Sequence, residues 1–146
     1  MNLLLDRSKI ATLIPHAGAM CLLDGVTEWD PTSITCVASS HRAPGNPLVT
    51  GGRLEAVCGV EYASQAMAVH GGLVRERRFA AGYLASLRDV SCSVERLDTL
   101  GHDLLVTAEL LIEDGARVIY GFRLSCNDRP VLSGRAAVVI DAGGTA

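Results

Sequence analysis

The sequence predicts an α+β fold in which a strongly curved antiparallel sheet wraps around one long central helix. A proline-free, alanine-rich segment from about Leu54 to Val69 is apolar on nearly every face, which is typical of a helix surrounded by protein. Two strand-like segments precede it and four follow it in a hairpin meander. The chain has 146 residues, of which 49% are hydrophobic, enough to bury one sizeable core. We therefore expect a single domain over residues 1–146.

The segments before the central helix follow from turn and breaker signals. Residues 6–13 predict a short helix that ends ahead of Pro15, because the residue before a proline avoids helical backbone. Residues 20–29 and 33–39 predict two strands joined by an Asp-Pro-Thr turn. Residues 41–52 contain two prolines and three glycines, which predict a long shaped loop of the kind that often carries function.

Four strands are predicted after the central helix. Apolar and polar residues alternate along 118–126, and 104–112 repeats the pattern. The dipeptide Asp114-Gly115 between them is a strong signal for a tight hairpin. Residues 83–97 and 131–140 supply the other two strands. Since such a sheet leaves an edge strand exposed, we expect two subunits to pair edge to edge in a dimer.

Composition excludes several classes of function. Thirteen basic and sixteen acidic residues give a net charge of −3, which offers no footprint for nucleic acid. Charged and polar residues interrupt the longest apolar stretch, so we expect no membrane span. The apolar run at the amino terminus is too short for a signal core, which favours the cytoplasm. Five widely spaced cysteines without a C-x-x-C pair predict reduced core thiols and no metal site.

The unusual residue of the central helix is Glu61. Its neighbours one turn away are Val57, Cys58, Ser64 and Gln65, which place it on a mostly apolar face. A carboxylate there is costly unless it is paired, and burial favours its protonated form, which is what a general acid needs. A structural glutamate that bonds to Gln65 or faces solvent through a gap in the sheet fits the same periodicity.

Three histidines are candidate partners for Glu61. His41 opens the breaker-rich loop, where proline and glycine would hold the imidazole at a fixed angle, and His16 lies in an earlier turn. His70 lies about two and a half turns further along the helix and faces elsewhere, so we expect a helix-end residue suited to the negative end of the dipole. His102 is predicted to be exposed in a turn, and a solvated role is common for any lone histidine in a loop.

Three motifs in chain order resemble the β-hydroxyacyl-acyl-carrier-protein dehydratases, which have a hot-dog fold. Residues 15–26 resemble the first-strand motif of that family. His41 with the Pro-Gly-Asn-Pro run at 44–47 is similar to its His-Phe-Pro-Gly loop, and residues 61–66 resemble the start of its catalytic helix. The likeness extends over roughly residues 14–140. Within the family, the helix looks like the dehydratase-like branch associated with aryl polyene pigment synthesis.

The resemblance implies a 3-hydroxyacyl-[acyl-carrier-protein] dehydratase that removes water from a thioester. The acyl group would be carried on the phosphopantetheine arm of acyl carrier protein or on coenzyme A, and no metal or nucleotide cofactor is implied. His41 would be the base for the α-proton and Glu61 the acid for the hydroxyl, contributed by different subunits of a dimer. In the family's loop an aromatic residue, Pro and Gly directly follow the histidine, whereas here Arg42 and Ala43 lie between His41 and the Pro-Gly pair, so His16 is kept as a second candidate base.

Substrate contacts are implied on both sides of the helix. Gly59, or one of the loop glycines before it, would offer a backbone amide to the thioester oxygen at the helix N-terminus. The helix face that carries Gln65 and the inner side of the strand around Leu84 and Leu87 would line a narrow apolar tunnel for the acyl chain.

The carrier protein is acidic in this family, and the cluster Arg75, Arg77 and Arg78 is a candidate surface for steering it. Two other functions fit the same residues. A hot-dog acyl thioesterase would use Glu61 to activate water against the thioester. A non-catalytic dehydratase-like subunit of a heterodimer would keep the fold and the dimer surface while a related subunit carried out the reaction.

Overall fold

A computed structural model of the chain describes all residues except 1, 17, 76–81 and 141–146. The sheet contains seven strands, β1 (Leu5–Asp6), β2 (Gly25–Asp30), β3 (Ser33–Ala38), β4 (Gly82–Cys92), β5 (Leu104–Asp114), β6 (Arg117–Cys126) and β7 (Arg129–Ile140). The α-helices are α1 (Arg7–Ala11) and α2 (Gly59–Arg75), and single 3₁₀ turns lie at Gly18–Met20, Ser40–Arg42 and Ala56–Cys58.

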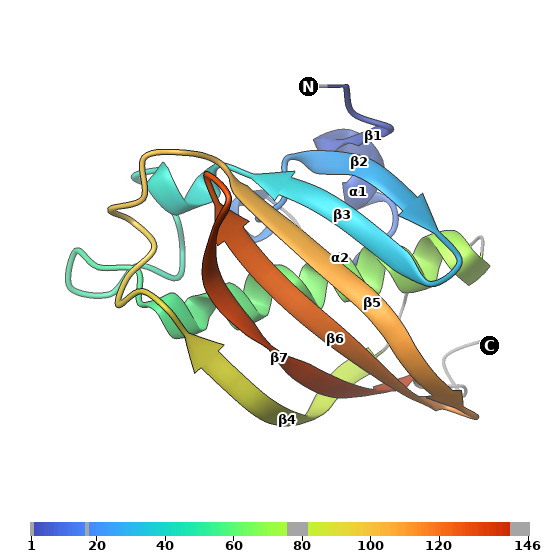
Figure 1. Cartoon of the computed structure of the whole chain (residues 1–146). Helices are drawn as coiled ribbons and strands as arrows, with labels where there is room; N and C mark the ends of the chain where they lie inside the picture. The colour runs from blue at the N-terminus through green and yellow to red at the C-terminus, as the bar shows by residue number, and fades with distance from the viewer. Residues whose placement is uncertain (1, 17, 76–81, 141–146) are drawn as a thin grey trace.

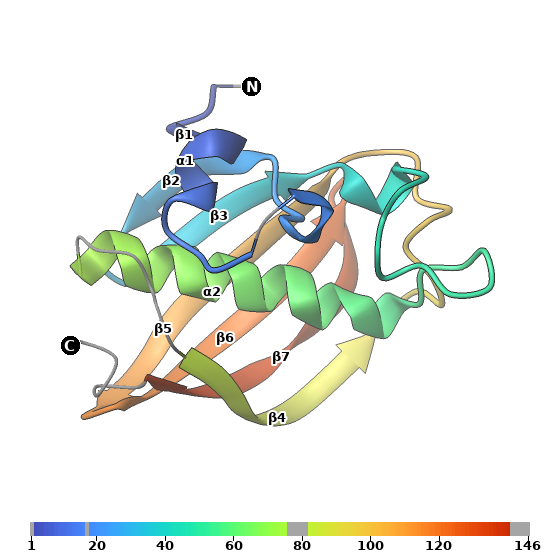
Figure 2. The ribbon, with the colours of Figure 1, turned by 180° about the vertical axis from the view of Figure 1, so that it is seen from behind.

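The strands are hydrogen-bonded in the order β1-β2-β3-β5-β6-β7-β4, and every neighbouring pair is antiparallel. The sheet curves around α2, which runs across its concave side (Figure 1; Figure 2). The prediction of a curved antiparallel sheet wrapped around one long helix is confirmed. In the described chain β4 pairs only with β7, so it forms one edge of the sheet.

The two helices differ in detail from the predictions. The carboxylate of Asp6 caps α1 by accepting a hydrogen bond from the backbone N–H of Lys9 at 3.0 Å. The central helix begins at Gly59, later than predicted, because a 3₁₀ turn precedes it, and it continues past Val69 to Arg75. The added β1 was not predicted, because a strand of two residues leaves no periodic signal.

The turns that join β5, β6 and β7 have the backbone conformations that their residue types favour. Gly115 has φ +60° in the turn between β5 and β6, as the Asp-Gly signal predicts. Asn127 and Asp128 have φ +52° and +64° between β6 and β7, a conformation that these two residue types tolerate better than most. Strand β4 ends at Cys92 and not at Leu97, because its pairing with β7 stops at Leu132.

The core lies between α2 and the concave side of the sheet. From the helix it contains Tyr62, Ala63, Ala66, Met67 and Val69, and from the strands Val106, Ala108, Phe122, Leu124, Leu132 and Ala136. Cys21, Cys36 and Cys126 are buried free thiols as predicted, whereas Cys58 is half-buried and Cys92 is exposed. Neither described helix is long and apolar enough to cross a membrane.

Candidate active site

Glu61 and His16 meet at the start of α2. Glu61 lies in the first turn of the helix, where the dipole favours a carboxylate. Its Oε1 atom is 3.2 Å from Nε2 of His16, which lies in the segment after α1. The side chains are 35% and 26% exposed, so the predicted burial of Glu61 is wrong for the single chain. A carboxyl group and an imidazole at this distance can share one proton.

The other ring nitrogen of His16 is left without a partner. Nδ1 is buried and makes no hydrogen bond to any described residue. If the Nε2 hydrogen is donated to Glu61, Nδ1 carries the free lone pair of the ring. The pair therefore contains a proton acceptor, Nδ1 of His16, and a candidate proton donor, the carboxyl group of Glu61.

Gln65, one turn after Glu61, binds the segment that carries His16. Its Oε1 accepts a hydrogen bond from the backbone N–H of Leu22 at 2.9 Å, and its Nε2 donates to the carbonyl of Met20 at 2.7 Å. The same nitrogen lies 3.5 Å from Oε1 of Glu61. Gln65 has no exposed surface in the single chain, and its predicted role in substrate binding stays a prediction.

His41 lies in a different environment. Its ring is 1% exposed, and Nε2 is 2.9 Å from the carbonyl of His102 and 3.2 Å from that of Leu100. Carbonyls only accept, so Nε2 carries the proton, and Nδ1 is buried without a partner. Burial lowers the pKa of His41, with the nearby guanidinium of Arg42 adding to the effect. Within the described chain, Glu61 contacts His16 and not His41.

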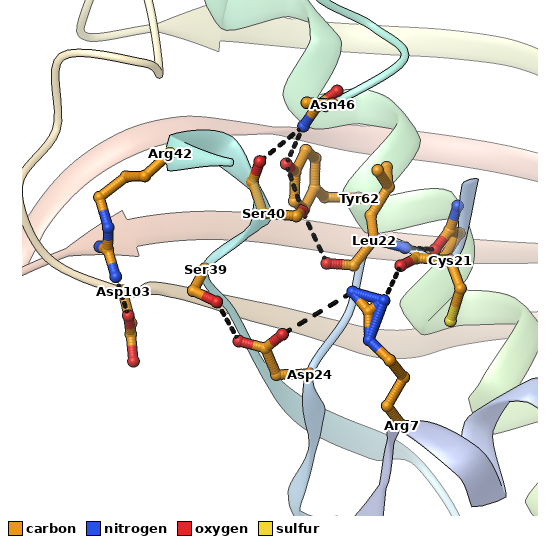
Figure 3. A network of polar contacts seen from close by, with 11 residues as sticks. Arg7, Cys21, Leu22, Asp24, Ser39, Ser40, Arg42, Asn46, Tyr62 and Asp103 are labelled. Carbon is orange, nitrogen blue, oxygen red and sulfur yellow. Dashed lines mark hydrogen bonds and ion pairs between the residues drawn. The ribbon is translucent and has the colours of Figure 1, made fainter. Parts of the chain in front are cut away.

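The loop of His41 is held to α2 by a buried polar network (Figure 3). Ser40 Oγ donates to the carbonyl of Leu22 at 2.8 Å and lies 2.8 Å from the hydroxyl of Tyr62. Because the single Ser40 hydrogen is used on Leu22, Tyr62 donates to Ser40. Asn46 Nδ2 then donates to the Tyr62 oxygen at 3.1 Å and to the Ser40 carbonyl at 2.8 Å. Burial raises the pKa of Tyr62 and so keeps its hydroxyl protonated.

Two ion pairs brace the surrounding loops (Figure 3). Arg42 bonds to Asp103 at 2.7 Å, which ties the His41 loop to the segment before β5. Arg7 donates to the carbonyl of Cys21 at 2.9 Å and lies 3.9 Å from Asp24. Asp24 also accepts from Ser39 at 2.6 Å, so the segment after His16 is fixed from both sides.

The residues of this network were not among those predicted to matter. Tyr62, Ser40 and Asn46 are buried, and a polar residue inside an otherwise apolar helix or loop is the signal that could have found them. This signal is weak because the sequence does not indicate which polar side chains form hydrogen bonds with one another.

Gly59 has a packing role in the structure. A side chain at this position would place Cβ 2.7 Å from Leu132 Cδ2 and 3.0 Å from Leu124 Cδ2, so glycine lets α2 begin this close to the sheet without displacing these leucine side chains. The free amides expected here are partly used, since Cys58 N–H donates to Glu55 and Gly59 N–H donates to Ala56. The thioester contact of Gly59 stays a prediction.

Leu84 and Leu87 lie on β4 opposite Val138 and the buried Ala136, which places them on the concave side of the sheet. Paired residues of antiparallel strands share a face. Both leucines are 39% exposed, and Val90 on the same strand is 38% exposed. The single chain therefore leaves an apolar row open along the edge strand, and the predicted lining of an acyl tunnel stays a prediction.

His70 is not the helix-end residue that was predicted. It is buried within α2, where Nε2 donates to the carbonyl of Asp30 at 2.9 Å and Nδ1 accepts from the hydroxyl of Tyr120 at 2.7 Å. Burial lowers the pKa of His70. The predicted exposure of His102 is confirmed.

Of the predicted basic cluster, only Arg75 lies within the described residues, where it pairs with Glu113 at 3.3 Å. Arg77 and Arg78 lie outside them. The described residues contain no group of three or more histidine, cysteine or carboxylate side chains arranged to hold a metal ion.

A single long helix inside a curved antiparallel sheet, with a glutamate and a histidine paired at the start of that helix, defines a hot-dog protein with a candidate acid–base site. The profile of the ApeP-like dehydratases, described as ApeP dehydratase, matches residues 8–142. The chain belongs to this family. The match confirms the resemblance to the dehydratases that the motifs indicated. A search of curated protein sequences returns no match.

Solved structures agree on the fold. The dehydratase heterocomplex ApeI:P from Xenorhabdus doucetiae superposes with a TM-score of 0.82 at 24% identity, covering 92% of each chain. AziG from S. sahachiroi gives 0.61 at 13% identity, covering 83% of this chain and 91% of that one. Zebra fish thioesterase superfamily member 2 gives 0.62 at 14% identity, covering 92% and 93%. Proteins named as dehydratases and as thioesterases thus share this architecture, so the fold alone does not choose between the two activities.

Proposed function

We propose that this chain is a dehydratase subunit that removes water from a β-hydroxyacyl thioester carried by acyl carrier protein in aryl polyene synthesis. The observation that supports the proposal is the contact of 3.2 Å between His16 and Glu61 at the start of α2, in a chain of the ApeP-like dehydratase family. An elimination needs one group that takes a proton and one that gives a proton, and these are the two groups present.

The proposed reaction balances on this pair. Neutral His16 takes the α-proton of the substrate, and protonated Glu61 gives its proton to the β-hydroxyl, which leaves as water while the carbon–carbon double bond forms. The pair then holds an imidazolium and a carboxylate. Transfer of one proton from Nε2 to Oε1 across the contact returns both groups to their neutral forms with the ring hydrogen on Nδ1, and proton exchange with water then restores the Nε2 tautomer. The elimination is redox-neutral overall, so the proposal requires no redox cofactor, and the two side chains supply both proton transfers without a metal.

His41 has a different role in this proposal. The base suggested by the family's His-Phe-Pro-Gly loop is replaced by His16, because His16 already contacts the acid while His41 donates to two backbone carbonyls. His41 then serves to hold its loop in place.

We propose that the working protein is a dimer with a second hot-dog subunit, located in the cytoplasm. Strand β4 has a partner on one side only in the described chain, and its apolar side chains Leu84, Leu87 and Val90 are partly exposed. A second sheet placed along β4 would cover this row. The similar Xenorhabdus structure is a dehydratase heterocomplex, which supports a partner related to this chain but different from it.

The test is to incubate the purified chain, alone and in complex with the hot-dog subunit that copurifies with it, with 3-hydroxyacyl carrier protein. Intact-mass spectrometry of the carrier protein then reports the reaction. Loss of one water supports the dehydratase. Release of free acid would identify a thioesterase, the activity named for several proteins of this fold. An unchanged mass in both preparations would leave a non-catalytic subunit.

A further inference from the structure

Gln65 has both ends of its side-chain amide fixed by the backbone. It is fully buried, its oxygen accepts from Leu22 N–H at 2.9 Å, and its nitrogen donates to the Met20 carbonyl at 2.7 Å. A backbone N–H only donates and a carbonyl only accepts, so the orientation of the amide is determined. Gln65 thereby binds the stretch that begins four residues after His16.

The same amide also reaches the acid. Its nitrogen has a second hydrogen, and Glu61 Oε1 lies 3.5 Å away on the helical turn before it. Glu61 Oε1 is also the atom that contacts His16. One side chain therefore touches the acid directly and holds the backbone segment of its imidazole partner.

Other contacts brace this segment further from His16. The Leu22 carbonyl accepts from Ser40, and the Cys21 carbonyl accepts from Arg7. The carbonyl of Met20, the residue of this stretch nearest in sequence to His16, is bound by Gln65. Gln65 therefore holds the residue of this stretch that lies nearest to His16 in sequence, and Arg7 and Ser40 hold the two residues that follow it.

We propose that Gln65 is a positioning residue that holds His16 and Glu61 at their working separation, an inference that rests on the proposed function. It does not act on the substrate itself. A displacement of about 1 Å between reacting groups costs on the order of a hundredfold in rate. A side chain that bound the substrate would chiefly raise KM when lost, whereas a positioning residue chiefly lowers kcat.

The kinetic test compares two variants that each remove a buried hydrogen-bonding side chain from α2. Gln65→Met keeps the length of the side chain but loses the amide, and Tyr62→Phe loses the hydroxyl that binds Ser40 and Asn46. Assays run well below the Tm of each variant, so that both are folded. We expect Gln65→Met to lower kcat by about tenfold to a hundredfold with KM within about threefold. Tyr62→Phe lowers Tm but keeps kcat within about threefold.

The inference is overturned if Gln65→Met keeps the kcat of the unmodified chain, if its loss lies chiefly in KM, or if Tyr62→Phe loses kcat to the same extent. An equal loss of kcat in Tyr62→Phe would show that any weakening of the buried hydrogen bonds is enough to lower kcat.

A spectroscopic test needs no turnover and so separates this inference from the proposed function. The ring ¹⁵N resonance of His16, assigned with His16→Asn, shifts when Glu61→Gln removes the carboxylate from its partner. In the Q65M background we expect the same Glu61→Gln change to shift that resonance by less than half as much. An equal shift in both backgrounds would refute positioning by Gln65. If the chain has no dehydratase activity and the coupling is nevertheless lost, only the proposed function fails.

Discussion

His16 and His41 are alike in the environment of Nδ1 and differ in the hydrogen-bond partner of Nε2. In both rings Nδ1 is buried without a partner. Nε2 of His16 faces the carboxyl group of Glu61, whereas Nε2 of His41 faces the carbonyls of Leu100 and His102. A carboxylate can take a proton and return it, but a backbone carbonyl only accepts a hydrogen bond and so fixes one tautomer. The partner of Nε2 thus makes His16 a candidate catalytic residue and gives His41 a structural role.

The largest expected effect comes from breaking the first pair. Glu61→Gln keeps the shape of the side chain but removes its ionisable carboxyl group, and His16→Asn removes the base. We expect each to lower dehydration by about 10²- to 10⁴-fold, the usual contribution of general acid–base groups. Loss of water from 3-hydroxyacyl carrier protein, read by intact mass, measures the effect. His102→Asn, at an exposed position, is the matched control.

A His16→Asn variant with normal turnover would remove His16 from the mechanism. Normal turnover in Glu61→Gln would refute the assignment of both roles, because no acid would then be accounted for.

Replacing His41 tests the second half of the comparison. His41→Leu removes the hydrogen bonds to Leu100 and His102, and it leaves the two backbone carbonyls without that donor. We expect the free energy of unfolding to fall by about 2–4 kcal/mol, measured by urea denaturation. The kcat of the folded variant should stay within about threefold. A loss of a hundredfold or more in a stably folded His41→Gln variant would instead restore His41 as the base.

The pH dependence of stability gives a smaller effect. Burial lowers the pKa of His41 and His70 in the folded chain, while both titrate near the ordinary value of 6.5 when unfolded. Below that pH the unfolded chain binds more protons than the folded one, so stability falls as the solution is acidified. We expect a slope of up to about 1.4 kcal/mol per pH unit from each ring.

Urea denaturation of His41→Gln at a series of pH values between about 7.5 and 5 isolates one ring. The slope below pH 6.5 should become shallower than in the unmodified chain. An identical slope in His41→Gln would show that the His41 ring gains its proton equally well in both states.

The fold was largely predictable because its signals are local. Alternation along β5 and β6, the Asp114-Gly115 pair and the apolar central helix each fix an element from neighbouring residues alone. The errors fall where tertiary contacts set the boundary. The helix starts at Gly59, after a 3₁₀ turn and where the backbone lies close to Leu132, and β4 stops where β7 no longer pairs with it.

The candidate site was predictable in its members but not in its pairing. Glu61 and both loop histidines were identified from the sequence. Glu61 meets His16 and not His41 because Gln65 draws the segment at 20–22 onto the helix, across more than forty residues of chain. A hydrogen bond between residues so far apart in the chain does not change the local periodicity of the sequence, so it could not be predicted. The breaker-rich loop correctly indicated a shaped segment, yet its histidine faces Leu100 and His102.

The hydrogen-bond chain from Asn46 through Tyr62 and Ser40 to Leu22 runs in one direction only, because its ends are an amide that must donate and a carbonyl that must accept. This chain cannot relay protons, because reversing its hydrogen bonds would leave the Asn46 amide and the Leu22 carbonyl without a partner. The centre therefore exchanges hydrogen ions with water through the exposed sides of Glu61 and His16, and a second chain docked at that opening would control the exchange.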